Sequence, residues 1–581
     1  MPYIWPLPKE YTHGDATVTI DAQHFRFFTP QQSNELIEAF QRYMDIIFYR
    51  KAAIVESGVR NVNVEVDEGK AELQMDTDES YEITIPDDGS DITIHAKNPF
   101  GAMHGIETVS QLIVYDPITA TYVIKNAPWK IVDAPRFPHR GILMDTARHY
   151  ESLPSIKKLI DSMTYAKLNV LHWHITDSQS NPAQSLAFPQ WWEGSYTTME
   201  RYTTMDMEEI VEYARMRGIR VIPEMDVPGH EASWCAGYPE VCPRVNCQEP
   251  LDPTSDKTWE LINGVLGEWS GNEKRKGIFF DDFFHMGGDE VDTSCWKNTD
   301  HIVSWMKAHN FTDSDTYRYF VDKVHGFLKE KQRNGIYWEE VWNNFGTKLD
   351  KDTIIETWMN KKTMKSVVSN GYRVIISDPV IYLDHLDKTW AEMYADEPFE
   401  FTDVPEEQAL VMGGEACMWA ETVDVSDLYN TVWPRAGAFA ERYWSPREVN
   451  NVEEAHDRMM YFRCLLNQRG VPAAPTNNEK GRSAPPGPGS CYAQLRVCYK
   501  QDTPISSSSS SPLPPSLAAP PAPRSPPSCA LASASLPRPL ADPRSCPARP
   551  PRSPACRSSR GLRSRRRLES LPERVHPLPD S

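Results

Sequence analysis

From Arg136 onward the sequence repeats one pattern through most of the remaining chain. Short apolar runs of strand length alternate with longer segments of helical periodicity, which is typical of βα units and a parallel sheet. Eight such runs occur, at Gly141–Thr146, Val170–Asp177, Arg220–Asp226, Phe283–Glu290, Ile336–Val341, Ile354–Trp358, Arg373–Ser377 and Ala409–Glu421. Because eight parallel strands close a barrel, the pattern predicts an α/β fold with a (β/α)8 TIM barrel over residues 134–494.

The segments on either side of the predicted barrel have different patterns. Residues 1–133 mix helical periodicity with short alternating runs, which predicts a smaller α+β domain. Residues 495–581 are rich in Pro, Ser and Arg, a composition that cannot bury enough apolar surface to fold. We therefore expect a disordered C-terminal tail. An artefact of the gene model is the alternative explanation for its abrupt change in composition.

The charge and the apolar distribution exclude several classes of partner. The formal net charge is -20 and the pI is near 5.3, so neither nucleic acid nor an anionic membrane surface is expected. The chain contains no apolar stretch of about 20 residues, so membrane insertion is not expected either. Residues Met1–Pro8 lack the basic and apolar regions of a recognisable signal peptide. A neutral ligand fits this composition best.

The eleven cysteines do not have a metal-binding spacing. The sequence has no Cys-x-x-Cys pair, so a zinc site built on paired thiolates is not expected. A few disulfides formed in an oxidising compartment remain the open alternative.

Polar and aromatic residues gather at the ends of the predicted strands. They are Asp145, Asp177, Asp226 with His230, Asp289 with Glu290, Trp338, Trp358, and Trp419 with Glu421. In TIM barrels the loops after the strands converge at one mouth and carry the reactive groups. The sequence therefore predicts an active site at that mouth.

The adjacent carboxylates of Asp289 and Glu290 follow two glycines, Gly287 and Gly288. Neighbouring side chains on a strand point to opposite faces, but the glycines permit a turn that directs both carboxylates to the mouth. Two carboxylates in one pocket push their pKa values apart, so that one holds a proton while the other stays ionised. This pattern indicates acid catalysis. A solvated rim or a helix cap is the alternative interpretation.

Three indoles at separate strand ends favour a sugar pocket. Trp338, Trp358 and Trp419 offer faces on which the C–H groups of a sugar can stack. Sugar hydroxyls need charged partners, and the candidates are Arg140, Asp384 and Glu421. Ordinary core packing is the alternative for each indole taken alone.

His172 and His174 lie two residues apart on a predicted strand, a spacing that also fits a pair of metal ligands. A metal-dependent barrel would need further ligands at other strand ends, and only His230 is well placed. We therefore expect no metal and no cofactor. We predict instead that the two histidines support the loop at Asp177.

Several ordered motifs of the chain resemble the eukaryotic β-hexosaminidases of glycoside hydrolase family 20. The motifs are Phe137–Tyr150, Leu171–Asp177, Pro223–His230, Met286–Val291 and Gly413–Trp419. The resemblance runs from about residue 15 to Gln494. It implies an exo-acting, retaining β-N-acetylhexosaminidase that removes a terminal N-acetylhexosamine from a glycoconjugate or a chitin oligosaccharide.

The resemblance also implies roles for individual residues. Glu290 matches the general acid/base, and Asp289 matches the carboxylate that orients the substrate's 2-acetamido group. The carbonyl oxygen of that group is the nucleophile in this family, so the enzyme supplies none. Asp177 and His230 match a relay beside the acid/base.

The remaining matched residues form the sugar pocket. Tyr382 matches the hydroxyl that binds the acetamido oxygen, and the three indoles match the pocket walls. Arg140, Asp384 and Glu421 match the groups that grip the sugar hydroxyls and close the site behind one sugar.

The resemblance further suggests disulfides, a location and an assembly. It pairs Cys247 with Cys295 and Cys464 with Cys491, and leaves Cys417 as a buried thiol. It implies a lysosomal, vacuolar or secreted protein and a homodimer. Cys235 and Cys242 have no match.

Three rival functions remain open at this point. A carbohydrate-binding pseudoenzyme would keep the aromatic pocket, but loss of Glu290 would be its expected mark. A related hydrolase that removes a disaccharide conflicts with a pocket closed behind one sugar. A metal-dependent barrel hydrolase would be inhibited by a chelator.

Overall fold

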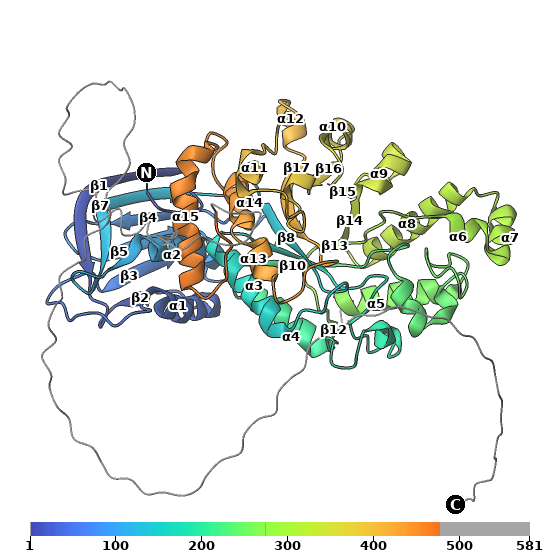
Figure 1. Cartoon of the computed structure of the whole chain (residues 1–581), viewed down its shortest axis with the longest axis horizontal. Helices are drawn as coiled ribbons and strands as arrows, with labels where there is room; N and C mark the ends of the chain where they lie inside the picture. The colour runs from blue at the N-terminus through green and yellow to red at the C-terminus, as the bar shows by residue number, and fades with distance from the viewer. Residues whose placement is uncertain (1, 273–274, 477–581) are drawn as a thin grey trace, which may run out of the picture. The chain divides into compact units, whose positions relative to one another are not determined.

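The computed structural model describes residues 2–272 and 275–476 (Figure 1). The predicted barrel is confirmed, because eight parallel strands close in the order β10-β13-β14-β15-β16-β17-β8-β9. The strands are β8 (His139–Asp145), β9 (Val170–His174), β10 (Arg220–Glu224), β13 (Phe283–His285), β14 (Asn334–Trp338), β15 (Ile354–Thr357), β16 (Arg373–Ile376) and β17 (Val411–Met418). Nearly all of their residues are buried, as expected for parallel strands covered on both faces.

Helices connect the barrel strands and cover them. The α-helices are α3 (Leu153–Tyr165), α4 (Thr204–Arg215), α5 (Asp256–Ser270), α6 (Ser294–Lys297), α7 (Asp300–His309), α8 (Asp313–Glu330), α9 (Glu339–Phe345), α10 (Lys361–Ser369), α11 (Trp390–Ala395), α12 (Pro405–Gln408), α13 (Leu428–Val432), α14 (Arg435–Trp444) and α15 (Val452–Gln468). Helix α4 shows how the local sequence determines where a helix begins and which face it buries. Thr203 and Asp206 form a capping box at its start, and its buried residues recur at helical spacing.

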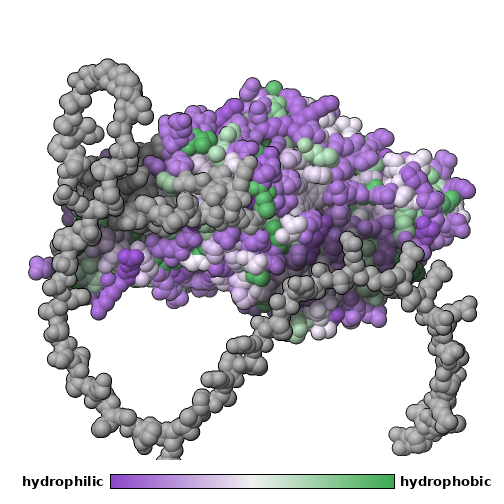
Figure 2. Space-filling view, in the orientation of Figure 1, coloured by the Kyte–Doolittle hydropathy of each residue, from purple (hydrophilic) through white to green (hydrophobic). Residues whose placement is uncertain are grey.

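Shorter elements complete the barrel region. The 3-10 helices are η1 (Trp191–Gly194), η2 (Ala232–Ala236), η3 (Pro239–Val241), η4 (Gly346–Lys348) and η5 (Pro379–Ile381). Strands β11 (Gly271–Asn272) and β12 (Arg275–Lys276) pair with each other outside the barrel. The visible face of the described residues is mostly hydrophilic, with hydrophobic side chains scattered over it (Figure 2).

The smaller domain at the N-terminus is a seven-stranded sheet with two helices, in agreement with the predicted α+β class. Its strands are β1 (Glu10–Ile20), β2 (Arg26–Phe28), β3 (Asn61–Val66), β4 (Tyr81–Ile85), β5 (Ile92–Ala96), β6 (Ile113–Asp116) and β7 (Thr121–Asp133), and its helices are α1 (Asn34–Ile47) and α2 (Pro99–Leu112). Buried and exposed residues alternate along β4, so one face of the sheet packs into a core. Helix α2 is buried along almost its whole length.

One disulfide closes a loop after β10, and a second joins the same region to α6 after β13. Cys247–Cys295 confirms the pairing expected from the resemblance, whereas Cys235–Cys242 was not foreseen. Cys417 is a buried free thiol, as expected. Cys491 and the tail at residues 495–581 lie outside the described residues, so those predictions stay untested. Within residues 2–272 and 275–476, no helix is both long enough and apolar enough to cross a membrane.

Candidate active site

The turn after β13 places Asp289 and Glu290 at the barrel mouth. Gly287 and Gly288 adopt φ values of 60° and 87°, a region that favours glycine. A Cβ atom at Gly287 would overlap the carboxylate of Asp226. That carboxylate accepts a hydrogen bond from the Gly288 amide at 2.8 Å. The glycine pair thus makes the turn that the sequence predicted.

The two adjacent carboxylates have different environments. The side chain of Asp289 is 13% exposed, and burial together with the neighbouring Asp226 carboxylate raises its pKa well above the usual range. The side chain of Glu290 is 62% exposed, and the His230 imidazole 3.6 Å away lowers its pKa. The pKa values of the two carboxyls diverge as predicted, with that of Asp289 raised and that of Glu290 lowered. The difference in exposure explains the difference in pKa, because solvent and the imidazole both favour the charged form of Glu290.

His230 connects these carboxylates to Asp177, as the expected relay requires. Its Nδ1 lies 3.4 Å from Oδ1 of Asp177, and its Nε2 lies 3.7 Å from Asp289 and 3.6 Å from Glu290. Asp177 is fully buried, and its other oxygen lies 2.8 Å from Nε2 of His174. His174 therefore supports Asp177 as predicted, whereas His172 contacts Glu224 and Glu415 instead.

The predicted aromatic residues form one cluster above the barrel core, with Leu143 and Cys417 beneath it. Trp338 is 1% exposed and lies 5.9 Å from Trp419 between ring centroids. Trp358 stacks on Tyr382 at 6.2 Å with an interplanar angle of 14°. Trp358 and Trp419 are only partly buried, so part of their surface remains available at the mouth.

Two buried carboxylate oxygens at the mouth lack a donor. Among the described residues, nothing donates a hydrogen bond to Oδ1 of Asp289 or to Oδ1 of Asp384. Burial raises the pKa of Asp384 to about 6. Glu421 is exposed and lies within electrostatic range of Asp384. Buried acceptors are normally satisfied, so these two oxygens indicate a binding site for a ligand with N–H or O–H donors.

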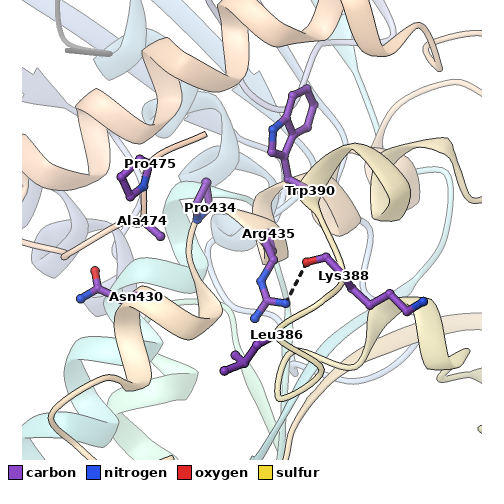
Figure 3. A pocket seen from close by; sticks show the side chains of 8 residues that line it. All are labelled: Leu386, Lys388, Trp390, Asn430, Pro434, Arg435, Ala474 and Pro475. Carbon is purple, nitrogen blue, oxygen red and sulfur yellow. Dashed lines mark hydrogen bonds between the residues drawn. The ribbon is translucent and has the colours of Figure 1, made fainter. Parts of the chain in front are cut away.

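The loop that carries Tyr382 and Asp384 is anchored from behind by Arg435, the first residue of α14. Its guanidinium donates to the main-chain oxygens of Leu383, His385 and Lys388. Figure 3 shows this contact with Lys388 in a pocket lined by Leu386, Lys388, Trp390, Asn430, Pro434, Arg435, Ala474 and Pro475. None of the predicted site residues lines this pocket. It therefore backs the loop and is not the predicted site.

Arg140 is a correction to the sequence prediction. It is the second residue of β8 and so lies at the opposite end of that strand from the mouth. It is fully buried, and its guanidinium binds the carboxylate of Glu79 in the N-terminal domain at 2.7 and 2.9 Å. It also lies over the ring of Trp444 at 4.9 Å. Arg140 joins the two domains and cannot reach a sugar at the mouth.

Arg148 is the arginine of the site that the prediction missed. It lies three residues beyond the end of β8, and its guanidinium binds Asp177 at 2.6 Å and Asp145 at 3.2 Å. It lies 5.1 Å above the ring of Trp419. The polarity of β8 was the available signal, because a residue after a barrel strand reaches the mouth and a residue at its start does not.

The comparisons with known proteins agree with this geometry. A model described as "Glycosyl hydrolase family 20, catalytic domain" matches residues 137–447, and one described as "beta-acetyl hexosaminidase like" matches residues 4–112. The chain belongs to glycosyl hydrolase family 20. Beta-hexosaminidase 1 of Arabidopsis thaliana is 44% identical over 517 residues, which cover 85% of this chain and 94% of the relative.

More distant members of family 20 match over a similar length. Beta-hexosaminidase subunit alpha of Rattus norvegicus is 35% identical over 508 residues, which cover 81% of this chain and 93% of that subunit. The solved structure of a Flavobacterium johnsoniae chitobiase has a TM-score of 0.72 and 26% identity, and covers 81% of this chain and 73% of that one. This family 20 chain is therefore a glycoside hydrolase.

The two arginines give a direct test of the correction in this family 20 enzyme. We expect Arg140→Lys to lower the free energy of unfolding, since breaking a buried ion pair costs about 3–5 kcal/mol and Lys retains only part of the contact. We expect Arg148→Lys to lower kcat/KM about 10- to 100-fold, the cost of a hydrogen bond to a charged group. Urea denaturation and steady-state kinetics measure the two effects. A raised KM for Arg140→Lys at unchanged stability would contradict the correction.

A buried network of histidines and carboxylates lies in the barrel beneath the site. Glu224 is its centre, with one oxygen 2.6 Å from His174 and 3.0 Å from His172, and the other 2.8 Å from the Trp338 indole nitrogen. His172 also lies 2.8 Å from Glu415. These carboxylates raise the pKa of His174 to about 10 and that of His172 well above the usual range. The imidazoles are therefore charged partners of the carboxylates.

This network predicts that stability falls at alkaline pH. The folded protein keeps a proton on His174 up to about pH 10, whereas the unfolded chain releases it near 6.5, so stability is complete below 6.5 and declines between these values. The expected slope is about 1.4 kcal/mol per pH unit for one such group. Urea titrations across this range measure it. High salt should leave the decline in place because buried pairs are poorly screened, and a flat profile would contradict the assignment.

Proposed function

We propose that the chain is an exo-acting, retaining β-N-acetylhexosaminidase that removes terminal N-acetylglucosamine or N-acetylgalactosamine from glycoconjugates or chitin oligosaccharides. The observation that carries the proposal is the pair of unsatisfied buried oxygens on Asp289 and Asp384, in loops after β13 and β16 at the end of the barrel where the indoles cluster. An acetamido N–H fits the first oxygen and a sugar hydroxyl fits the second. Membership of family 20 supports the same chemistry.

Catalysis proceeds in two displacements in this proposal. The acetamido carbonyl oxygen attacks C1 while the C1–O bond to the leaving group breaks, and Glu290 gives its proton to the departing oxygen. This attack closes an oxazolinium ring. Water then attacks C1 and reopens the ring, while Glu290 takes a proton from that water. Two inversions at C1 give overall retention. The bound sugar would cover Glu290, and loss of solvent would raise its pKa towards that of a working acid.

Asp289 stabilises the acetamido group as positive charge develops on it. Burial raises the pKa of both Asp226 and Asp289, and the Asp226 carboxylate raises that of Asp289 further, so the pair retains a proton. The acetamido N–H donates to Asp289 and favours its charged form, which leaves the proton with Asp226. The indoles and the Tyr382 hydroxyl hold the acetamido group in line for attack.

The exo mode follows from the groups that would bind the sugar hydroxyls at the non-reducing end. We assign the sugar hydroxyls to Asp384, Glu421 and Arg148, the last in place of Arg140. These groups would close the site behind one sugar. The pseudoenzyme alternative is not favoured, because Glu290 is present at the mouth and contacts His230.

The anomer and the size of the first product test this proposal. A chitin oligosaccharide labelled at its reducing end should release only unlabelled monosaccharide at first, and NMR should show the β-anomer before mutarotation. Release of a disaccharide would exclude the exo mode proposed here. An initial α-anomer would exclude the double displacement.

Location and assembly are the finer parts of the proposal. The two disulfides support an oxidising compartment, in agreement with a lysosomal, vacuolar or secreted enzyme. The homodimer expected from the resemblance is retained as a proposal. Light scattering after size-exclusion chromatography tests it, and a monomeric mass at working concentration would reject it.

A further inference from the structure

Glu340 is a carboxylate at the barrel mouth for which the sequence analysis gave no role. It is the second residue of α9, and this helix begins directly after Trp338, the last residue of β14. The side chain is partly buried, and its Oε2 accepts a hydrogen bond from the indole Nε1 of Trp358 at 3.0 Å. Trp358 follows the neighbouring strand, β15. The contact therefore fixes a wall of the pocket to the adjacent βα unit.

The preceding residue, Glu339, holds the backbone at the same place. Its buried carboxylate accepts hydrogen bonds from the main-chain amides of Trp358 at 2.8 Å and Met359 at 2.7 Å. These contacts set the position of the Trp358 Cα atom but leave the side-chain torsions free. Stacking on Tyr382 restrains the face of the indole, and Glu340 is the group that restrains its edge.

Packing alone does not hold this indole, in contrast to its neighbour. Trp338 is 1% exposed, and its indole nitrogen donates to the fully buried Glu224 at 2.8 Å. Trp358 remains partly buried and carries exposed surface. The position of Trp358 thus depends more strongly on its single side-chain hydrogen bond.

Glu340 also lies close to the turn that carries Asp289, because a Cβ atom at Gly288 would lie 2.8 Å from the side chain of Val341, the next residue of α9. Burial and then the Asp289 carboxylate raise the pKa of Glu340 to about 7. The carboxylates of Asp289 and Glu340 both contribute to raising the pKa of Tyr317. The indole edge held by Glu340 is therefore near the carboxylate that orients the acetamido group in the proposed function.

We propose that Glu340 is a positioning residue that holds the Trp358 indole against the acyl group of the substrate and so limits the size of that group. This inference rests on the proposed function. In a Glu340→Ala variant the indole edge loses its acceptor and can rotate away from the pocket. The pocket then admits a longer acyl chain, while the acetamido group is held less firmly.

The test compares kcat/KM for 4-nitrophenyl β-glucosaminides that carry N-acetyl, N-propionyl and N-butyryl groups. One methylene in an apolar pocket is worth about 10- to 200-fold in discrimination, so we expect the acetyl-to-propionyl ratio to fall about tenfold in Glu340→Ala. Glu340→Gln keeps an oxygen acceptor and should restore most of the ratio. Glu330→Ala, an exposed glutamate at the end of α8, is the matched control and should leave the ratio unchanged.

A second variant keeps the inference testable if Glu340→Ala is poorly folded. Trp358→Phe removes the indole N–H while Glu340 stays in place, so the acetyl-to-propionyl ratio should fall in this variant too. An unchanged acetyl-to-propionyl ratio in folded Glu340→Ala, with equal losses for all three substrates, would overturn the inference. Wild-type protein that fails to turn over the N-acetyl substrate would instead overturn the proposed function itself.

Discussion

The Glu290→Gln variant should lose about 10²- to 10⁴-fold in kcat/KM on an oligosaccharide, the usual contribution of a positioned general acid. Gln keeps the shape of the side chain and its hydrogen-bond acceptor but has no proton to give to the departing oxygen. The loss should be smaller for a 4-nitrophenyl substrate, because that leaving group departs without protonation. Steady-state rates on both substrates measure the difference.

Asp292→Asn is the matched control for this variant. Asp292 is an exposed carboxylate two residues further along the same loop, and it accepts hydrogen bonds from Ser294. Its loss should leave both rates close to wild type. If Glu290→Gln kept wild-type turnover of the oligosaccharide, Glu290 would not be the acid.

The second large effect is expected for Asp289→Asn. A neutral amide cannot offset the positive charge that develops on the acetamido group, so kcat should fall about 10²- to 10³-fold, as for loss of one preorganised electrostatic contact. Unlike Glu290→Gln, this variant should lose the same factor with good and poor leaving groups, because the defect lies in the attack on C1.

Asp289→Asn should also be at least as stable as the wild type at neutral pH. Burial and the nearby Asp226 carboxylate disfavour the charged form of Asp289, and the substitution removes this cost. Thermal melting measures it. An inactive variant with a clearly lower Tm would indicate a role in folding, and unchanged kcat would remove Asp289 from the mechanism.

The barrel could be predicted because its physics is visible in the sequence. Strands covered on both faces read as continuous apolar runs, and each predicted run overlaps an observed strand. The ends of the runs were less accurate. Val170–Asp177 was expected to be one strand, but β9 ends at His174. The predicted run was too long because residues 175–177 stay buried after they leave the sheet.

The candidate site could be predicted only in part, since several of its contacts join loops that are distant in sequence. Arg140 came from the resemblance, and its place before the apolar run Gly141–Thr146 puts it at the end of β8 that faces away from the mouth. Glu340 lay inside the predicted strand Ile336–Val341, whereas it is the second residue of helix α9. The Cys235–Cys242 disulfide was missed because spacing along the chain does not give the distance between two Cα atoms, here 5.9 Å.

The most direct test of the account is the turnover of 4-nitrophenyl N-acetyl-β-D-glucosaminide by the full chain, beside the matching β-glucoside. The two substrates differ only at C2, where one carries the acetamido group and the other a hydroxyl. We predict hydrolysis of the acetamido sugar and no measurable hydrolysis of the glucoside. Equal turnover of the two would contradict a mechanism in which the substrate supplies the nucleophile.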